Sequence, residues 1–138
     1  MNNRRSGGHR ALWVGSALLL AALAGCSSGG PDIVPVSGRV TRNGKPVPFV
    51  TVYFQPTSGR PSLGNCDADG RFKLGYTREQ DGAKVDTHTV YVVYFPEGSA
   101  GPAPPDFKDI YAKYGTPELS PLKIEVKKAM KDLEIKVD

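Results

Sequence analysis

Apolar and polar residues alternate along most of the chain after residue 32, and a spacing of two predicts half-buried β-strands. The segments with this alternation, or with a run of β-branched residues, are 33–40, 49–55, 71–74, 87–95, 122–126 and 133–137. One of them, 87–95, is apolar on both faces, which is typical of a central strand that is covered on both sides. The last two segments are predicted to pair with each other as a terminal hairpin with one solvated face.

Turn residues separate these segments. The Asn43-Gly44 dipeptide favours a tight primed turn between two strands. The stretch from Asp67 to Gly70 predicts a second turn, in which Gly70 is free to take a positive φ. Helix is expected only around Phe107 to Tyr114. About seven short strands separated by turns favour a two-sheet sandwich over a barrel, so the expected fold is all-β.

The first 25 residues have a different pattern. Three arginines lie among the first ten residues, and residues 11–24 form an apolar run. A helix of that length would extend about 21 Å, which is shorter than the ~30 Å hydrocarbon core of a bilayer. A basic start, a short apolar run and small residues at its end together indicate a secretory signal peptide.

The end of this segment carries a more specific motif. Leu23, Ala24, Gly25 and Cys26 resemble the lipobox of bacterial lipoprotein precursors. The resemblance implies that the Cys26 thiol is acylated, that the peptide before it is removed, and that the mature chain is held to a membrane by lipid. Ser27 resembles the residue found at this place in lipoproteins sorted to an outer membrane. An uncleaved signal anchor with a chance cysteine is the alternative.

These patterns divide the chain into a signal peptide (1–25), a flexible tether (26–32) and one domain (33–138). The chain has 18 basic and 14 acidic residues, and three of the basic residues belong to the signal peptide. The remainder is nearly neutral and alternates in sign, which predicts a solvated, charge-mixed surface. No nucleic-acid partner is therefore expected.

Four stretches carry a resemblance to a known family. They are PVSGRVTRNGKPVPFVTVYFQP (35–56), DADGRFKL (67–74), DGAKVDTHTVYV (81–92) and KYGTPELSPLKIEVKK (113–128). They are similar to carboxypeptidase regulatory-like, transthyretin-like domains, most closely to small bacterial lipoproteins made of one such domain. The resemblance implies a Greek-key sandwich (transthyretin- or prealbumin-like, Ig-like). It also implies a non-catalytic cell-envelope module that binds or supports other envelope components, without a cofactor.

Few side chains could carry catalysis or bind a metal. His88 is the only histidine after Cys26, whereas zinc sites use several His or Cys ligands. The resemblance implies that His88 lies where a strand begins and has a structural hydrogen-bonding role. Cys66 is interpreted as a small buried residue, with a disulfide between two chains or a Cys26–Cys66 disulfide as the alternatives. The Asp67–Gly70 stretch lacks the spacing of a calcium loop, and no metal is expected. A transthyretin-like hydroxyisourate hydrolase is the enzymatic alternative, but this chain lacks the histidines and the Tyr-Arg-Gly-Ser tail of those enzymes.

Tyrosines are numerous for so small a domain. The candidate partner surface consists of Tyr53, Tyr91, Tyr111 and Tyr114, which could stack on sugar rings or grip a peptide. The alternative is that tyrosine is simply a good strand residue with a polar end. The resemblance further implies that Tyr114 pins the long loop to the sandwich. A protein or glycan of the envelope is the expected partner, in addition to the membrane.

Overall fold

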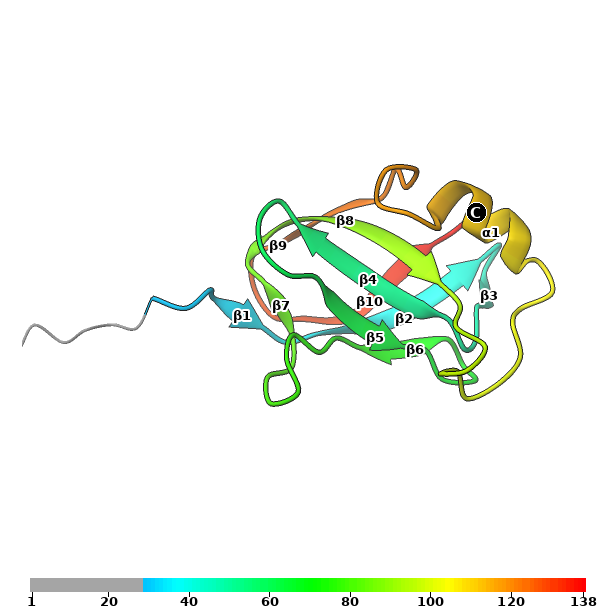
Figure 1. Cartoon of the computed structure of the whole chain (residues 1–138), viewed down its shortest axis with the longest axis horizontal. Coiled ribbons are helices and arrows are strands. Elements are labelled where there is room, and N and C mark those ends of the chain that lie inside the picture. The colour runs from blue at the N-terminus through cyan, green and yellow to red at the C-terminus, as the bar shows by residue number, and fades with distance from the viewer. Residues whose placement is uncertain (1–28) are drawn as a thin grey trace, which may run out of the picture.

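The computed structural model describes residues 29–138 (Figure 1). Seven of its strands have three or more residues: β2 (Val36–Arg42), β4 (Thr51–Pro56), β5 (Ser62–Asn65), β6 (Arg71–Lys73), β8 (Asp86–Val93), β9 (Lys123–Val126) and β10 (Met130–Lys136). The two-residue strands are β1 (Ile33–Val34), β3 (Lys45–Pro46) and β7 (Ala83–Lys84), and the helix is α1 (Phe107–Tyr114). The protein is mostly β, and the helix lies where the sequence predicts it.

The first sheet is built around β2. Strand β10 pairs with one edge of β2, and β3 and β6 pair with successive parts of the other edge. The pairing of β10 with β2 is parallel, while the other two pairings are antiparallel. Close to one end of the molecule, β1 and β7 form a small separate sheet (Figure 1).

The second sheet has the order β5-β4-β8-β9 and is antiparallel throughout. Strand β8 is therefore central, as its apolar sequence predicts. Its inner face is fully buried at His88, Val90 and Val92. Its outer face, which includes Tyr91, is only half-buried, so the prediction of cover on both sides is wrong for that face.

The predicted terminal hairpin is also wrong. Strand β9 pairs with β8 in the second sheet, whereas β10 pairs with β2 in the first. Residues 127–129 therefore connect the two sheets instead of closing a hairpin. Alternation tells which face of a strand is buried, and a sandwich buries one face of every strand whichever sheet holds it.

The two sheets enclose a single hydrophobic core. Its fully buried members include Val36, Val40, Ile135, Val52, Phe54 and Val90. The first three come from the first sheet and the others from the second. Burying a side chain of this kind contributes about 1.5–3 kcal/mol, so the packing between the sheets dominates the stability of the fold.

Both predicted turns are confirmed. Asn43 and Gly44 have φ of 50° and 78°, as a primed turn requires, and they join β2 to β3. Gly70 has φ of 72°. Asp67 closes the second turn by accepting hydrogen bonds from the backbone N–H groups of Asp69 and Arg71, both 2.9 Å long.

Candidate functional site

The lipobox residues Leu23, Ala24 and Gly25, and the acylation candidate Cys26, lie outside the described residues. Acylation at Cys26 stays a prediction.

His88 lies in the core and does not reach the surface. Its exposed fraction is 0%, its ring packs 5.6 Å from that of Phe54, and its Nε2 is 2.7 Å from the backbone oxygen of Lys84. Because a carbonyl can only accept, Nε2 carries the proton and donates it. Nδ1 has no partner among residues 29–138. This agrees with the structural hydrogen-bonding role expected for His88.

Cys66 is also a core residue, with 4% of its surface exposed. Burial raises the pKa of its thiol to about 12, and the neighbouring Asp67 carboxylate adds to the rise. The thiol is therefore protonated at neutral pH and is a poor nucleophile. The structure supports the interpretation of Cys66 as a small buried residue.

Tyr53 and Tyr91 form a stacked pair on the outer face of the second sheet. They are opposite each other on β4 and β8, with ring centroids 4.9 Å apart and ring planes at 9°. Burial raises the pKa of Tyr91, and Tyr53 and Glu118 contribute to the rise. Stacking covers one face of each ring, which reduces the aromatic surface available to a flat sugar ring.

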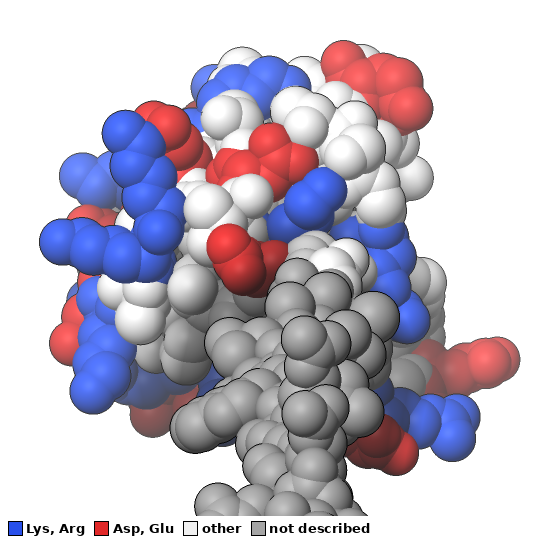
Figure 2. All heavy atoms as spheres, turned by 90° about the vertical axis from the view of Figure 1, so that its left-hand side faces the viewer, with Lys and Arg blue, Asp and Glu red and all other residues white. Residues whose placement is uncertain are grey.

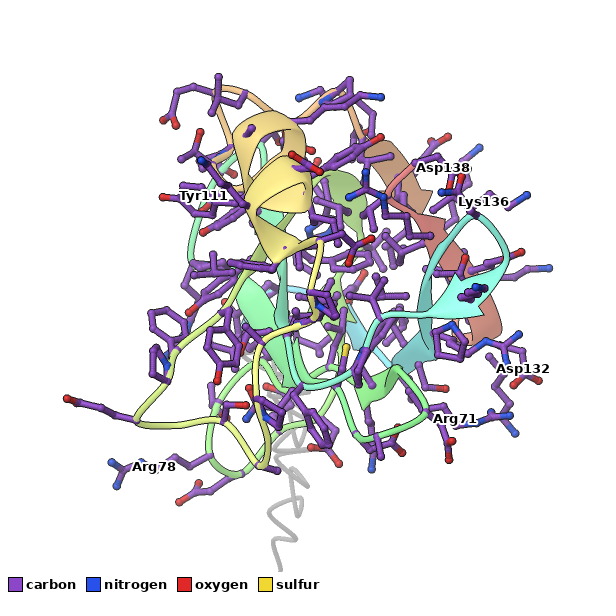
Figure 3. All side chains as sticks on the ribbon, turned by 90° about the vertical axis from the view of Figure 1, so that its right-hand side faces the viewer. Arg71, Arg78, Tyr111, Asp132, Lys136 and Asp138 are labelled. Carbon is purple, nitrogen blue, oxygen red and sulfur yellow. The ribbon has the colours of Figure 1, made fainter. Side chains whose placement is uncertain are left out.

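The other two tyrosines of the candidate surface, Tyr111 and Tyr114, differ strongly in exposure. Tyr111 is 45% exposed on α1, and Figure 3 shows it pointing away from the sandwich. Tyr114 is only 4% exposed, and its hydroxyl donates a 2.8 Å hydrogen bond to the backbone oxygen of Asp138. Tyr114 therefore cannot belong to a partner surface, and this part of the prediction is wrong. Its role is to fasten the helix to the chain after β10.

An ion pair that the sequence does not reveal joins β2 to the start of α1. Arg42 Nε lies 3.3 Å from Asp106 Oδ2, and Arg42 Nη1 donates a 3.2 Å hydrogen bond to the backbone oxygen of Asp106. No local signal could have shown it, because 64 residues separate the partners. The carboxylate that precedes the helix faces Arg42 and makes no side-chain capping hydrogen bond.

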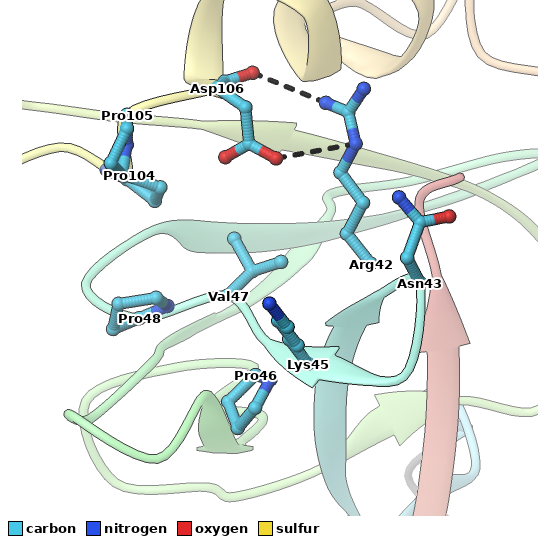
Figure 4. Close-up of a pocket in the computed structure, with 9 residues that line it drawn as sticks. All are labelled: Arg42, Asn43, Lys45, Pro46, Val47, Pro48, Pro104, Pro105 and Asp106. Carbon is cyan, nitrogen blue, oxygen red and sulfur yellow. Dashed lines mark hydrogen bonds and ion pairs between the residues drawn. The ribbon is translucent and has the colours of Figure 1, made fainter.

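A groove of about 320 Å³ lies beside this ion pair (Figure 4). Its lining residues are Arg42, Asn43, Lys45, Pro46, Val47, Pro48, Pro104, Pro105 and Asp106. Val47 is 3% exposed and forms an apolar part of the lining. Four of the nine lining residues are prolines, whose fixed φ restricts the backbone in these parts of the groove before any ligand arrives. Such a groove suits an extended, amphipathic segment more than a compact charged ligand.

A second hollow, of about 150 Å³, is lined entirely by residues of the first sheet and is strongly polar. Arg39 lies between Arg71 of β6 and Glu134 of β10 in the strand register, and Asp132 completes the charged lining. Figure 3 shows Arg71 and Asp132 on the same side of the molecule. Positive and negative groups balance here, which agrees with the charge-mixed surface predicted from the sequence.

None of the family models, curated proteins or solved structures that were compared with this chain matches it. Among residues 29–138, no helix is long and apolar enough to cross a membrane. The same residues contain no group of three or more His, Cys, Asp or Glu side chains that could hold a metal ion.

Proposed function

We propose that this chain is a lipid-anchored, non-catalytic module of a bacterial cell envelope, held at the outer membrane, that binds or supports other envelope components. The observation that carries the proposal is the sequence Leu23-Ala24-Gly25-Cys26, which follows a short apolar run and precedes a polar tether of a few residues. One acyl chain binds a bilayer only marginally, whereas two or three chains on Cys26 give a stable anchor.

The positions of the two most reactive side chain types support a non-catalytic role. His88 and Cys66 are both in the core, where substrate cannot reach them. A transthyretin-like hydrolase would need several histidines around one cleft, and His88 is the only histidine among the described residues. A binding role places no such demand on the core.

We also propose that the sandwich is a carboxypeptidase regulatory-like, transthyretin-like domain with Greek-key connections. The support is the agreement between the quoted motifs and their structural places. The Asn43-Gly44 motif forms the turn after β2, and the Asp67–Gly70 motif forms the turn before β6. Successive strands of the chain also pass several times from one sheet to the other, as they do in Greek-key sandwiches.

The anchor is tested by labelling growing cells with a fatty-acid analogue and by the intact mass of the purified chain. We expect label on the wild-type chain and none on Cys26→Ser. Persistent labelling of Cys26→Ser would refute the assignment of the lipobox.

A peptide partner is the second candidate function, and the groove beside Arg42 favours it over a glycan partner. Extended peptides bind well to rigid, proline- and apolar-lined grooves with a few polar groups at the rim. The stacked arrangement of Tyr53 and Tyr91, by contrast, leaves less open ring face for sugar stacking.

Site-specific photocrosslinking in native membranes tests the groove. A photoreactive residue replaces Lys45 at the rim, and Lys136 on the outer part of β10 is the control position. Both side chains are exposed. We expect one defined envelope protein to crosslink at position 45 and not at position 136. Equal crosslinking at both positions, or none at position 45, would refute the groove as the binding site.

A further inference from the structure

The two ends of the sandwich differ in charge. The end that carries β1, here called the tether end, is formed by the connections 57–61, 74–85 and 127–129 (Figure 1). The opposite end, here called the helix end, is formed by the connections 43–50, 66–70 and 94–122. The three connections of the tether end contain five basic and two acidic residues, whereas those of the helix end contain three basic and six acidic residues. The domain is therefore polarised along its length.

Several cations of the tether end are free to meet a partner. Arg78 and Lys128 are exposed and form no ion pair within residues 29–138. Lys127 is paired with Glu125 at 3.4 Å, but both side chains are more than half exposed, so solvent screens the pair strongly. Figure 2 shows this end of the molecule, where many Lys and Arg side chains lie at the left of the view, with Asp and Glu side chains among them.

An apolar hollow of about 220 Å³ lies at the start of β10, where its lining residue Ala129 directly follows Lys128. Pro35, Ala129 and Met130 contribute apolar walls, and Lys73 and Lys131 contribute to its lining as well. The backbone N–H of Met130 donates a 2.9 Å hydrogen bond to the oxygen of Pro35, which fixes the two walls relative to each other. Apolar groups next to lysines are the arrangement that favours the boundary between lipid headgroups and acyl chains.

The position of the tether determines which surface this end can meet. Strand β1 begins at Ile33, and the seven steps along the chain from Cys26 to Ile33 span about 25 Å at most when extended. If Cys26 is in the bilayer, the tether end is held within that distance of the headgroups. The anionic surface potential acts over about one Debye length, ~10 Å, so cations at this end can reach it.

We propose that the tether end docks on an anionic phospholipid surface and that the acidic helix end is turned away from it. Arg78, Lys127 and Lys128 contact headgroup phosphates, and Ala129 and Met130 lie at the boundary of the acyl region. The proposal rests on the anchoring of Cys26. It assigns an orientation: the groove beside Arg42 lies at the helix end and points away from the membrane, toward a partner.

The test measures which end of the domain is near the headgroups. The lipidated chain is reconstituted into vesicles of phosphatidylcholine, with or without phosphatidylglycerol, that contain a headgroup-spin-labelled lipid. A fluorophore is attached through Ala129→Cys at the tether end or through Ala103→Cys at the helix end, both of which are exposed positions. We expect quenching at position 129, with phosphatidylglycerol and at low salt, and little quenching at position 103. The buried Cys66 stays unlabelled in the folded chain.

Charge reversal gives the matched comparison. Lys128→Glu and Arg78→Glu should each weaken docking by about fivefold or more, which is the effect of one cation near an anionic surface. Lys45→Glu and Lys108→Glu at the helix end should leave it unchanged. Equal quenching at both label positions would overturn the proposal. Quenching at position 129 that does not depend on phosphatidylglycerol or on salt concentration would also overturn it. Intact mass of the same sample reports acylation of Cys26 separately, so failure of the anchor and failure of docking are distinguished.

Discussion

The hydroxyl of Tyr114 donates a 2.8 Å hydrogen bond to the backbone oxygen of Asp138, and the ammonium of Lys113 donates another to the same oxygen at 2.9 Å. Asp138 also accepts, through Oδ1, a 2.7 Å hydrogen bond from the backbone N–H of Asn43. Three parts of the chain that are distant in sequence are thus joined at one residue: the helix, the turn after β2 and the segment after β10.

Tyr114→Phe should lower the free energy of unfolding by about 1 kcal/mol, because it removes one hydrogen bond and keeps the buried ring. Urea unfolding followed by circular dichroism measures the change. Tyr111→Phe is the matched control on the same helix, where the ring is 45% exposed, and it should have no effect. Equal effects of the two variants would contradict the anchoring role of Tyr114.

Gly101→Ala should destabilise the long connection before α1. A Cβ at Gly101 would lie 2.4 Å from Cε2 of Phe49, and Phe49 already has a positive φ of 61°. Relieving such an overlap costs about 1–3 kcal/mol. At Gly98, in the same connection, the nearest atom would be 3.9 Å away, so Gly98→Ala is the control. Thermal unfolding should show a lower midpoint temperature for Gly101→Ala and an unchanged one for Gly98→Ala.

Cys66 should react with iodoacetamide only when the domain opens. Its thiol is 4% exposed and its pKa is raised to about 12, so neither access nor thiolate is available in the folded chain. Mass spectrometry should therefore show slow alkylation in buffer and complete alkylation in denaturant. Rapid alkylation of the folded chain would contradict the burial of Cys66.

The same pKa shift has a consequence for stability at alkaline pH. A raised pKa means that the folded state keeps a proton that the unfolded state releases above about pH 9. The contribution of the thiol is therefore complete below pH 9.0 and is lost as the pH rises toward about 12. The stability difference between wild type and Cys66→Ala should shrink over this range.

Asp86 should contribute a pH dependence of the opposite sign. The pKa of its carboxyl is lowered, mainly because the Thr57 hydroxyl donates a 2.6 Å hydrogen bond to it, and Lys84 assists. A lowered pKa means that the contribution is present above the ordinary value of 3.8 and is lost as the pH falls through the folded-state value. The free energy of unfolding of the wild type should be higher than that of Asp86→Asn at neutral pH. The difference should disappear as the pH falls through the folded-state pKa of Asp86. Asp109→Asn, exposed on α1, gives the background effect of losing one carboxylate.

Local patterns predicted the elements of this fold well. The Asn43-Gly44 turn, the Asp67–Gly70 turn and the helix over residues 107–114 all depend on neighbouring residues, whose preferences can be read directly. The apolar segment 87–95 likewise predicted the central strand β8, whose inner face carries Val90 and Val92.

Long-range relationships could not be predicted in the same way. The spacing of apolar residues in 122–126 and 133–137 is the same whether these strands pair together or join different sheets. The burial of Tyr114 depends on where the end of β10 lies, and the Arg42–Asp106 pair depends on how α1 docks. The strand pairing, the burial of Tyr114 and this ion pair all depend on residues that are distant in the sequence, so no local pattern predicts them.

The parallel pairing of β10 with β2 also determines when the domain can fold. Strand β2 is the first long strand of the sandwich to be synthesised and β10 is the last, so about 90 residues must be available before the first sheet closes. Until β10 is available, the sandwich is incomplete and the inner apolar face of the first sheet lacks its final strand. Folding of the first sheet is therefore completed only when this last strand has paired with β2, along the edge opposite to β3 and β6.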